Sequence, residues 1–284
     1  MRSNVLASDM GNVMVVVNYD AKLLNLSDKE YYGSYGEYLS VSLLKRFSDD
    51  PLAFDEYMEN RKDNEKPTDA LVLGQATHVA IMEGWDSFDK NYVVSDELVN
   101  PKTGKSYGRT TQKFLASCES LDVSPWRALA TTDVESIRSM EKAVRSDVQA
   151  SCAISECTNI EMAIRGKMYG VPFQGKLDGC SNDGLIVDLK TMRPDSTVFE
   201  QIVKYRYAWQ AYCYLKLYSE ATGIPYEDCQ FQFVFVTKEQ EPKVNVVLFT
   251  HEDVIDATDQ VGKALKAYKV STKDRRLALL ELEN

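Results

Sequence analysis

Two aspartates and a lysine stand in the two halves of a predicted β-hairpin. Residues 175–178 and 185–191 flank a Ser-Asn-Asp-Gly segment, and a turn of this composition between apolar runs is typical of antiparallel strands. Side chains alternate along a strand, so Asp188 and Lys190 share one face. Asp178 falls within about one residue of facing Asp188, where Cβ atoms of cross-strand neighbours lie roughly 4.5–5.5 Å apart. Carboxylates this close repel each other unless a cation lies between them, so the pattern predicts a hard metal ion with Lys190 free to act on a water.

The chain just before this hairpin adds a third carboxylate. Residues 159–174 are predicted to form two strands around a turn at Gly166–Lys167. Alternation along the first of them lets Glu161 approach the same edge as Asp178. An alternative is that Glu161 only pairs with Arg165, which follows on the same face.

A predicted helix over 70–83, capped by Asp69 and closed by Gly84, carries a histidine. Gly74 and His78 are four residues apart and therefore share a face, and the small Gly74 lets another backbone come close. A lone histidine in an apolar helix is more often a packed core residue than a ligand. His78 is a site candidate only together with the carboxylates.

An aromatic helix is predicted over 205–215, after the hairpin. Such a helix is ordinarily core. Arg206, Gln210 and Tyr214 are spaced by four, however, and would form a polar stripe along it. That stripe makes the helix a candidate part of the site.

A basic segment lies between residues 100 and 113, although the protein as a whole is acidic. Its cations stand among glycines and hydroxyl side chains, with Tyr107 inside the segment. The four cations are Lys102, Lys105, Arg109 and Lys113. They are candidate contacts to a nucleic-acid backbone. The alternative is an ordinary solvated loop.

Composition limits the classes of function. A chain of 284 residues that is 44% hydrophobic can bury a substantial core as one large or two small domains, and we expect one. The net charge of -10 and the pI near 4.9 argue against a general nucleic-acid coat protein. They leave room for an enzyme that confines its basic residues to one groove.

The six cysteines include no C-x-x-C pair, which argues against an iron–sulfur or structural zinc site. We expect reduced, buried thiols of a cytosolic protein. The apolar run 13–17 is too short for a signal peptide and is predicted to be a strand. The sequence holds no span of about twenty apolar residues, so no membrane association is expected.

The remaining patterns predict the fold class. Helices are expected over 40–47, 51–61, 131–149 and 252–269, and strands over 231–236 and 243–249. We therefore expect an α/β (α+β) protein, a single domain over 1–284. Residues 1–150 would form a mostly helical N-terminal layer with the DNA-contacting loop, and residues 151–284 a β-sheet core with flanking helices.

The order of these motifs resembles the PD-(D/E)xK nuclease superfamily. The motifs are Gly-x-x-x-His on a helix, a strand with Glu, Gly-x-x-Asp, Asp-x-Lys-Thr ten residues later, and Tyr-x-x-x-Gln-x-x-x-Tyr. Within the superfamily the chain is most similar to the exonuclease VIII (RecE-like) and phage-type exonuclease branch, related to RecB-type nuclease domains. The similarity runs from about Ser40 to Tyr218. It implies a restriction-endonuclease-like core, a central mixed β-sheet flanked by helices.

The resemblance assigns roles to particular residues. His78 matches the helical histidine of the family, Glu161 the first acidic residue, Asp178 and Asp188 the metal carboxylates, Lys190 the catalytic lysine, and Gln210 with Tyr214 the motif on the following helix. The segment 108–113 resembles a basic segment of that branch. The absence of a cysteine cluster separates the chain from iron–sulfur relatives.

These residues lead us to expect a Mg²⁺-dependent deoxyribonuclease. One or two ions, replaceable by Mn²⁺, would be bound by Asp178, Asp188, the Leu189 carbonyl, His78 and Glu161. Lys190, its pKa lowered by a nearby metal, would orient or deprotonate the attacking water. Gln210 and Tyr214 would contact phosphate or position Lys190, and Arg206 would join the basic segment in contacting DNA.

The resemblance also implies the kind of substrate and partner. We expect a 5′-3′ exonuclease that acts on double-stranded DNA ends and exposes single-stranded tails for recombination or annealing. A single-strand annealing protein as partner, a ring-shaped homo-oligomer and the bacterial host cytoplasm as location follow from the same kinship. Two alternatives stay open: an endonuclease of the same fold, and a non-catalytic DNA-binding module.

Overall fold

The structure is a computed structural model that describes residues 21–34, 36–60 and 67–282, with side chains described as far as Ser271. The strand expected over 13–17 lies outside these residues, as does the expected helix end at Arg61. No helix among the described residues is both long enough and apolar enough to cross a membrane.

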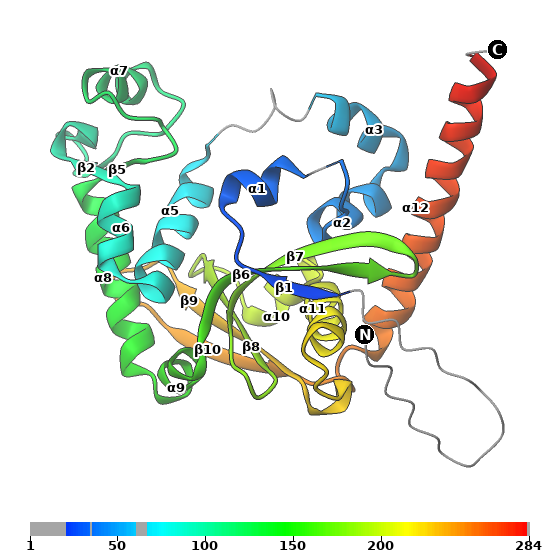
Figure 1. The fold of residues 1–284 in the computed structure, drawn as a ribbon. Helices are drawn as coiled ribbons and strands as arrows, with labels where there is room; N and C mark the ends of the chain where they lie inside the picture. The colour runs from blue at the N-terminus through cyan, green and yellow to red at the C-terminus, as the bar shows by residue number, and fades with distance from the viewer. Residues whose placement is uncertain (1–20, 35, 61–66, 283–284) are drawn as a thin grey trace.

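The core is a six-stranded mixed sheet in the order β1-β6-β7-β8-β9-β10 (Figure 1). Its strands are β1 (Lys22–Leu24), β6 (Asn159–Met168), β7 (Val171–Cys180), β8 (Leu185–Met192), β9 (Gln230–Thr237) and β10 (Val244–Phe249). Strands β8 and β9 are parallel, and the other neighbours are antiparallel. A mixed sheet in an α/β protein is therefore confirmed, and β1 ties the N-terminal part to the sheet of the C-terminal part.

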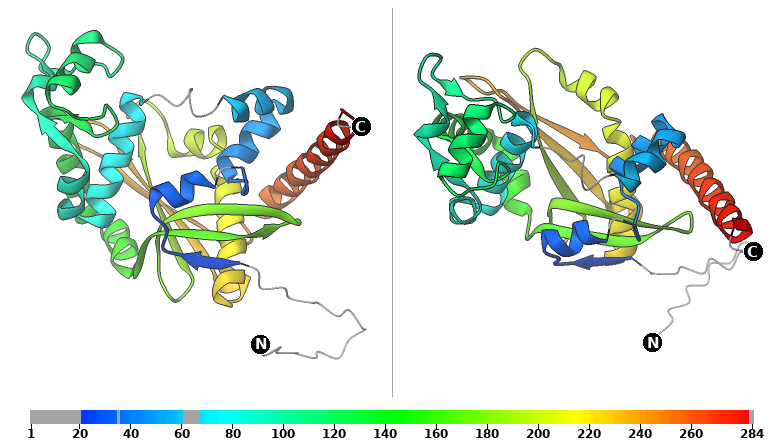
Figure 2. Two further views of the ribbon diagram at one scale, coloured as in Figure 1. Left: turned by 45° about the horizontal axis from the view of Figure 1, so that its top comes forward. Right: turned by 90° about the horizontal axis from the view of Figure 1, so that it is seen from above.

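Helices cover both faces of the sheet (Figures 1 and 2). They are α1 (Asp28–Gly33), α2 (Val41–Asp49), α3 (Pro51–Glu59), α5 (Asp69–His78), α6 (Trp85–Asn91), α7 (Gln112–Ser120), α8 (Thr131–Ser146), α9 (Val148–Glu156), α10 (Val198–Lys204), α11 (Tyr207–Thr222) and α12 (Ile255–Leu282). Two small sheets, β2 (Val93–Ser95) with β5 (Ala128–Ala130) and β3 (Val99–Asn100) with β4 (Lys105–Ser106), lie near α7.

Strand β8 shows how period-two alternation builds the two layers. Leu185, Val187 and Leu189 pack in the core shared with α5, α8 and α9. Ile186 and Met192 pack in the other core, which α2, α11 and α12 contribute to. The alternation expected from the sequence is thus confirmed. Asp188, on the second face, is 1% exposed and is the carboxylate that this arrangement buries.

The helices α5, α8 and α9 form the first layer, and α2, α11 and α12 form the second. A small lobe extends from the first layer at the N-terminal end of α5 (Figure 2). Its own core includes Leu98, Phe114 and Ala128. Arg109 lies inside the lobe, 5% exposed, over the Phe114 ring with 5.0 Å from guanidinium carbon to ring centre. Its Nη1 donates to the Pro125 carbonyl. The DNA contact predicted for Arg109 is therefore wrong, because the guanidinium is used to hold the loop together.

The turn between β6 and β7 differs from the prediction. It lies at Tyr169–Gly170, where both φ angles are positive (52° and 78°), as in the hairpin turns that match strand twist. Gly166 instead lies within β6, where it permits close packing. A Cβ there would lie 2.8 Å from Leu217 Cδ2 and 2.9 Å from Ala21 Cβ. The sequence analysis took Gly166 as the mark of a turn, whereas the structure shows that close packing requires a glycine there.

The predicted helices have different limits in the structure. The helix expected over 131–149 is broken at Asp147, whose side chain caps α9. The aromatic helix is interrupted at Arg206, which has a left-handed backbone between α10 and α11 (φ 48°). Helix α3 ends at Glu59, and α12 starts at Ile255 and continues to Leu282.

All six cysteines are free thiols in the structure. Cys118, Cys180, Cys213 and Cys229 are buried, as expected. Cys152 is exposed instead, with its Sγ 3.2 Å from Glu156 Oε1. The expectation of uniformly buried thiols was therefore wrong at this position.

We predict that Gly166→Ala lowers the free energy of unfolding by about 1–3 kcal/mol, because the new methyl would overlap Leu217 and the backbone of Ala21. Urea unfolding followed by circular dichroism measures the change. Gly33→Ala is the matched control, since no atom lies within 4 Å of the position of its Cβ. Equal stability of the two variants would contradict the packing role.

Candidate active site

Three carboxylates lie on three adjacent strands. The ladder between β7 and β8 pairs Gly179 with Val187 and Cys180 with Ile186. One step further this register brings Asp178 opposite Asp188, but there the ladder ends. Beyond the end of the ladder the Leu189 amide donates its hydrogen bond to Asp178 Oδ2, at 2.8 Å, instead of to a backbone carbonyl of β7. The two aspartates therefore lie where β7 separates from β8.

Glu161 occupies the corresponding place on β6. The pairs Ile160–Gly179 and Met162–Leu177 enclose it, so it lies across from Asp178. Its backbone is left-handed (φ 57°), a conformation that costs a residue with a side chain about 1–2 kcal/mol. Backbone strain of this kind is concentrated at functional sites, where the surrounding structure maintains it. Glu161 thus departs from the regular alternation that the sequence analysis assumed.

His78 joins two of these carboxylates from the covering layer. Its Nδ1 lies 3.1 Å from Glu161 Oε1, and its Nε2 lies 3.1 Å from Asp178 Oδ2. It is the last residue of α5 before a π-helical turn over Val79–Glu83, and such turns often occur at functional sites. His78 is therefore more than a packed core residue, although it is largely buried.

Gly74 explains how α5 comes this close to β8. A Cβ at Gly74 would lie 3.4 Å from Thr191 Oγ1, at the short end of ordinary van der Waals contact. The sequence analysis expected a close approach at this glycine. The structure identifies β8 as the partner, and this approach brings His78 to the carboxylates.

Lys190 and Gln210 both contact the carboxylate of Asp188. The ammonium of Lys190 forms an ion pair with Asp188 Oδ1, and the amide of Gln210 donates to Asp188 Oδ2. Lys190 also lies over Tyr207, with Nζ 5.3 Å from the ring centre. The lysine is thus adjacent to the carboxylates, and not buried away from them.

The site shifts several pKa values. Burial alone would lower the pKa of His78, but Asp178 and Glu161 raise it to about 9. Burial and the charge of Asp178 raise the pKa of Asp188. Burial opposes the ionisation of Asp178, yet His78 and Lys190 hold its pKa below the usual value. Burial likewise disfavours a charged Lys190, and Asp188 and Asp178 outweigh it, so its pKa is raised. The lowering we expected depends on a metal ion and stays a prediction.

The donor set fits a divalent cation. One ligand atom each from His78, Glu161 and Asp178 can lie within 4.8 Å of the others. His78 Nε2 and Asp188 Oδ1 are buried without a hydrogen-bond partner, although each faces an opposite charge. Carboxylate oxygens with an imidazole nitrogen suit hard or borderline metals. The compact set includes Glu161 and His78, with Asp188 beside it rather than within it.

Two residues of the predicted polar stripe lie elsewhere. Tyr214 is buried beneath the site, where a Cβ on Gly175 would be close to its ring. Arg206 lies at the break before α11, pairs with Asp49 and covers the Trp209 ring at 5.1 Å. Of the predicted stripe, Gln210 is the residue that touches a site carboxylate.

The three lysines of the basic segment are exposed on the lobe. Asp69, at the first turn of α5, contacts the backbone amide of Arg109 at 3.2 Å. His78 is at the other end of α5, so the segment and the carboxylates are separated by about 14 Å of helix rise. Lys102, Lys105 and Lys113 therefore lie too far away to touch the carboxylates, and their contact with DNA stays a prediction.

Sequence reasoning missed two lysines near the site. Lys176 pairs with Glu161 and, at 2.8 Å, with Asp28 Oδ1 of α1. The sequence position of Lys176 could have indicated this contact. In the β6–β7 register Lys176 lies opposite Ala163, which is two residues from Glu161. Lys45 of α2 lies over the ring of Tyr207. No local pattern could reveal that contact, since more than 160 residues separate the two positions.

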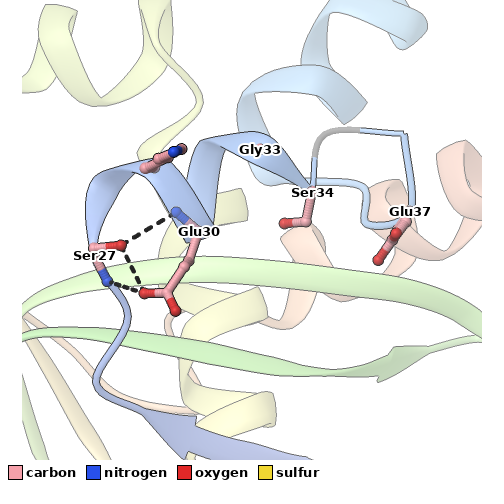
Figure 3. Close-up of a pocket in the computed structure, with 6 residues that line it drawn as sticks. Ser27, Glu30, Gly33, Ser34 and Glu37 are labelled. Carbon is pink, nitrogen blue, oxygen red and sulfur yellow. Dashed lines mark hydrogen bonds between the residues drawn. The ribbon is translucent and has the colours of Figure 1, made fainter.

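A hollow elsewhere on the surface is not this site. It is lined by Ser27, Lys29, Glu30, Gly33, Ser34 and Glu37 around α1 (Figure 3). In it, Ser27 and Glu30 bond each other in a capping box at the start of α1. Their polar atoms are thus used for local structure, and none of the site carboxylates lines the hollow.

A family model described as a PDDEXK-like domain of unknown function (DUF3799) matches residues 40–277, most of the chain. The chain belongs to this PD-(D/E)xK family. The matched region contains all the site residues named above, and members of the superfamily typically use divalent metals. Family and donor set together support a metal-using nuclease.

A solved structure agrees with the fold. The crystal structure of a Eubacterium rectale protein, provisionally named an exonuclease, matches with a TM-score of 0.60 at 18% identity, and the match covers 86% of each chain. The restriction-endonuclease-like core of this PD-(D/E)xK protein is thereby confirmed. Curated proteins gave no significant sequence match.

We predict that binding of Mn²⁺ at pH 7 releases about one proton, because His78 with a pKa of about 9 is protonated there and must lose its proton to offer Nε2 to a metal. Affinity should therefore rise between pH 7 and 9. Titration calorimetry in buffers of different ionisation enthalpy measures the release. His78→Gln should abolish it, whereas the control His251→Gln should keep it. Undiminished release in His78→Gln would contradict the assignment.

Proposed function

We propose that this protein is a Mg²⁺-dependent deoxyribonuclease that acts as a 5′-3′ exonuclease on double-stranded DNA ends. The observation that carries the proposal is the convergence of Glu161, Asp178 and Asp188 on adjacent strands, with His78 above them and Lys190 beside them. Carboxylates this close repel one another, and a divalent cation bound among them would relieve that repulsion.

The metal would be held by Asp178, Glu161 and His78, with Asp188 and the Leu189 carbonyl as further ligands. When bound, Mg²⁺ supplies Lewis-acid neutralisation of phosphate charge, and Mn²⁺ should replace it. Asp178 also accepts a hydrogen bond from the Leu189 amide, so the Leu189 carbonyl and the end of the β7–β8 pairing are positioned together.

The protein side chains account for the rest of the proposed reaction. Lys190 orients the attacking water and donates to the phosphate, while Asp188 and Tyr207 hold its ammonium in place. Gln210 fixes the carboxylate of Asp188. Water adds to phosphorus and the bond to the 3′ oxygen breaks, leaving a 5′-phosphate. Tyr214 supports β7 from below.

Exposed lysines would bind the DNA backbone. Lys102, Lys105 and Lys113 on the lobe suit sequence-independent contacts, which weaken as salt rises. Arg206 would contact a phosphate by giving up its ion pair with Asp49. The tailed product, a role in recombination, an annealing partner and a ring-shaped oligomer are parts of the proposal that rest on kinship with the RecE-like branch.

We expect Lys190→Met to reduce kcat on linear duplex DNA by at least about a hundredfold, because methionine has no ammonium group to orient the attacking water. Asp188→Asn should have a similar effect. The measurement is release of acid-soluble nucleotides with Mg²⁺. Lys263→Met, an exposed lysine of α12, is the control. Full activity of both site variants would refute the assignment of the site, and inactivity of the unaltered protein would favour a non-catalytic module.

Closed circular duplex DNA separates an exonuclease from an endonuclease of the same fold. We expect linear duplex to be degraded from its ends while the circle stays intact. The test follows both substrates on one gel, with end-labelled DNA to report polarity. Linearisation of the circle would replace the exonuclease proposal with the endonuclease alternative.

A further inference from the structure

Lys45 brings a second ammonium to the catalytic lysine from a distant part of the chain. It lies in α2, in the N-terminal layer, with Nζ 5.7 Å from the centre of the Tyr207 ring. Lys190 Nζ lies 5.3 Å from the same centre. Lys45 also donates to the Tyr205 carbonyl at 2.5 Å. Helix α2, the junction of α10 with α11, and strand β8 therefore meet at Tyr207.

The two ammonium groups differ in how their charge is balanced. Lys190 has Asp188 as its ion partner. In the part of the chain that the structure describes, Lys45 takes part in none of the ion pairs. The neighbouring Arg206 is neutralised by Asp49. Lys45 thus stands out as a half-buried cation that contacts the same aromatic ring as another cation, Lys190.

This placement is unfavourable for the protein on its own. Burial and the charge of Lys190 lower the pKa of Lys45 to about 8, so at neutral pH the ammonium still carries its charge. A partly desolvated cation next to a like charge is stabilised when an anion binds between or beside them. Tyr207 contributes an aromatic face to both cations but no negative charge.

The charges around β8 are therefore divided. Carboxylates and His78 gather where β7 leaves β8, which suits a cation. Lys190 and Lys45 gather on the Tyr207 side, which suits an anion. A nucleic-acid strand supplies the anion in the form of its phosphodiesters, whereas a free carboxylate ligand would not explain the adjacent metal donors.

We propose that Lys45, Lys190 and Tyr207 form a subsite for one phosphodiester of the bound DNA strand, and that Lys45 donates to one of its non-bridging oxygens. The inference rests on the proposed function, because it says how the same site grips its substrate. One donor of Lys45 stays on the Tyr205 carbonyl, and two are left for the phosphate. The subsite also couples the helical layer to the catalytic strand.

The opposing hypothesis is a structural tie: Lys45 only fastens α2 to the carbonyl of Tyr205. The two roles differ in salt dependence. A phosphate contact releases a counterion from DNA, and its loss lowers the slope of log affinity against log salt by about one. A structural tie leaves that slope unchanged.

The experiment measures binding of a fluorescein-labelled DNA duplex by anisotropy, with Ca²⁺ in place of Mg²⁺ to prevent cutting, at several salt concentrations. Lys45→Met should bind about tenfold more weakly at low salt, with the slope reduced by about one. Lys45→Arg keeps the charge and should keep the slope. Lys263→Met, at an exposed position of α12, is the matched control and should behave as the unaltered protein.

A second measurement needs no variant. Acetylation of lysines by a water-soluble ester, read by mass spectrometry, should modify Lys45 in the free protein and spare it when the duplex is bound. Lys263 should react equally in both states. This keeps the proposal testable where Lys45→Met does not fold.

Three results would overturn the inference. A lowered melting temperature with an unchanged salt slope would make Lys45 a structural tie. Acetylation of Lys45 to the same extent with and without DNA would exclude the contact. If the unaltered protein neither binds nor cuts DNA, the proposed function fails and the subsite with it, whereas cutting by the unaltered protein with an unchanged slope in Lys45→Met removes the subsite alone.

Discussion

Repulsion among buried carboxylates is the constraint around which this fold is arranged. Glu161, Asp178 and Asp188 face one another across neighbouring strands, and β-pairing alone would bring such residues together at a prohibitive electrostatic cost. Each forms an ion pair with a nearby cation: Glu161 with Lys176 of β7, Asp178 with His78 of α5, and Asp188 with Lys190 of the same strand, β8. The site is therefore a cluster of carboxylates whose negative charge is compensated by cationic side chains of the protein itself.

The layers of the fold have distinct tasks in supporting that cluster. The first layer supplies His78 through α5, which Gly74 allows to lie close to β8. The second supplies Gln210 through α11 and Lys45 through α2. Because each layer has its own hydrophobic core, the site lies between two rigid bodies of side chains rather than on a loop. A site placed in this way can hold strained backbone, such as that of Glu161, at little risk to the whole.

The sequence was sufficient for the parts of this picture that depend on periodicity and local spacing. Alternation along β8 placed Asp188 and Lys190 on one face, and the Ser-Asn-Asp-Gly turn placed Asp178 opposite. The failures have physical causes. Gly166 is small because Leu217 packs on it, not because the chain turns there. Arg109 is charged yet buried because its guanidinium donates to the Pro125 carbonyl and lies over the Phe114 ring. Lys45 and Lys176 reach the site through tertiary contacts, which a single sequence does not encode locally.

The double duty of Asp178 limits how the site can be altered. Its Oδ2 accepts a hydrogen bond from the Leu189 amide and lies beside His78, so one oxygen both joins two separating strands and belongs to the acidic cluster. Truncation to alanine would leave a peptide N–H without an acceptor and would loosen the fork itself. An asparagine retains an acceptor oxygen while discarding the negative charge. At this position the strand pairing therefore tolerates an amide, which removes the charge alone, far better than a methyl group, which removes the hydrogen-bond acceptor as well.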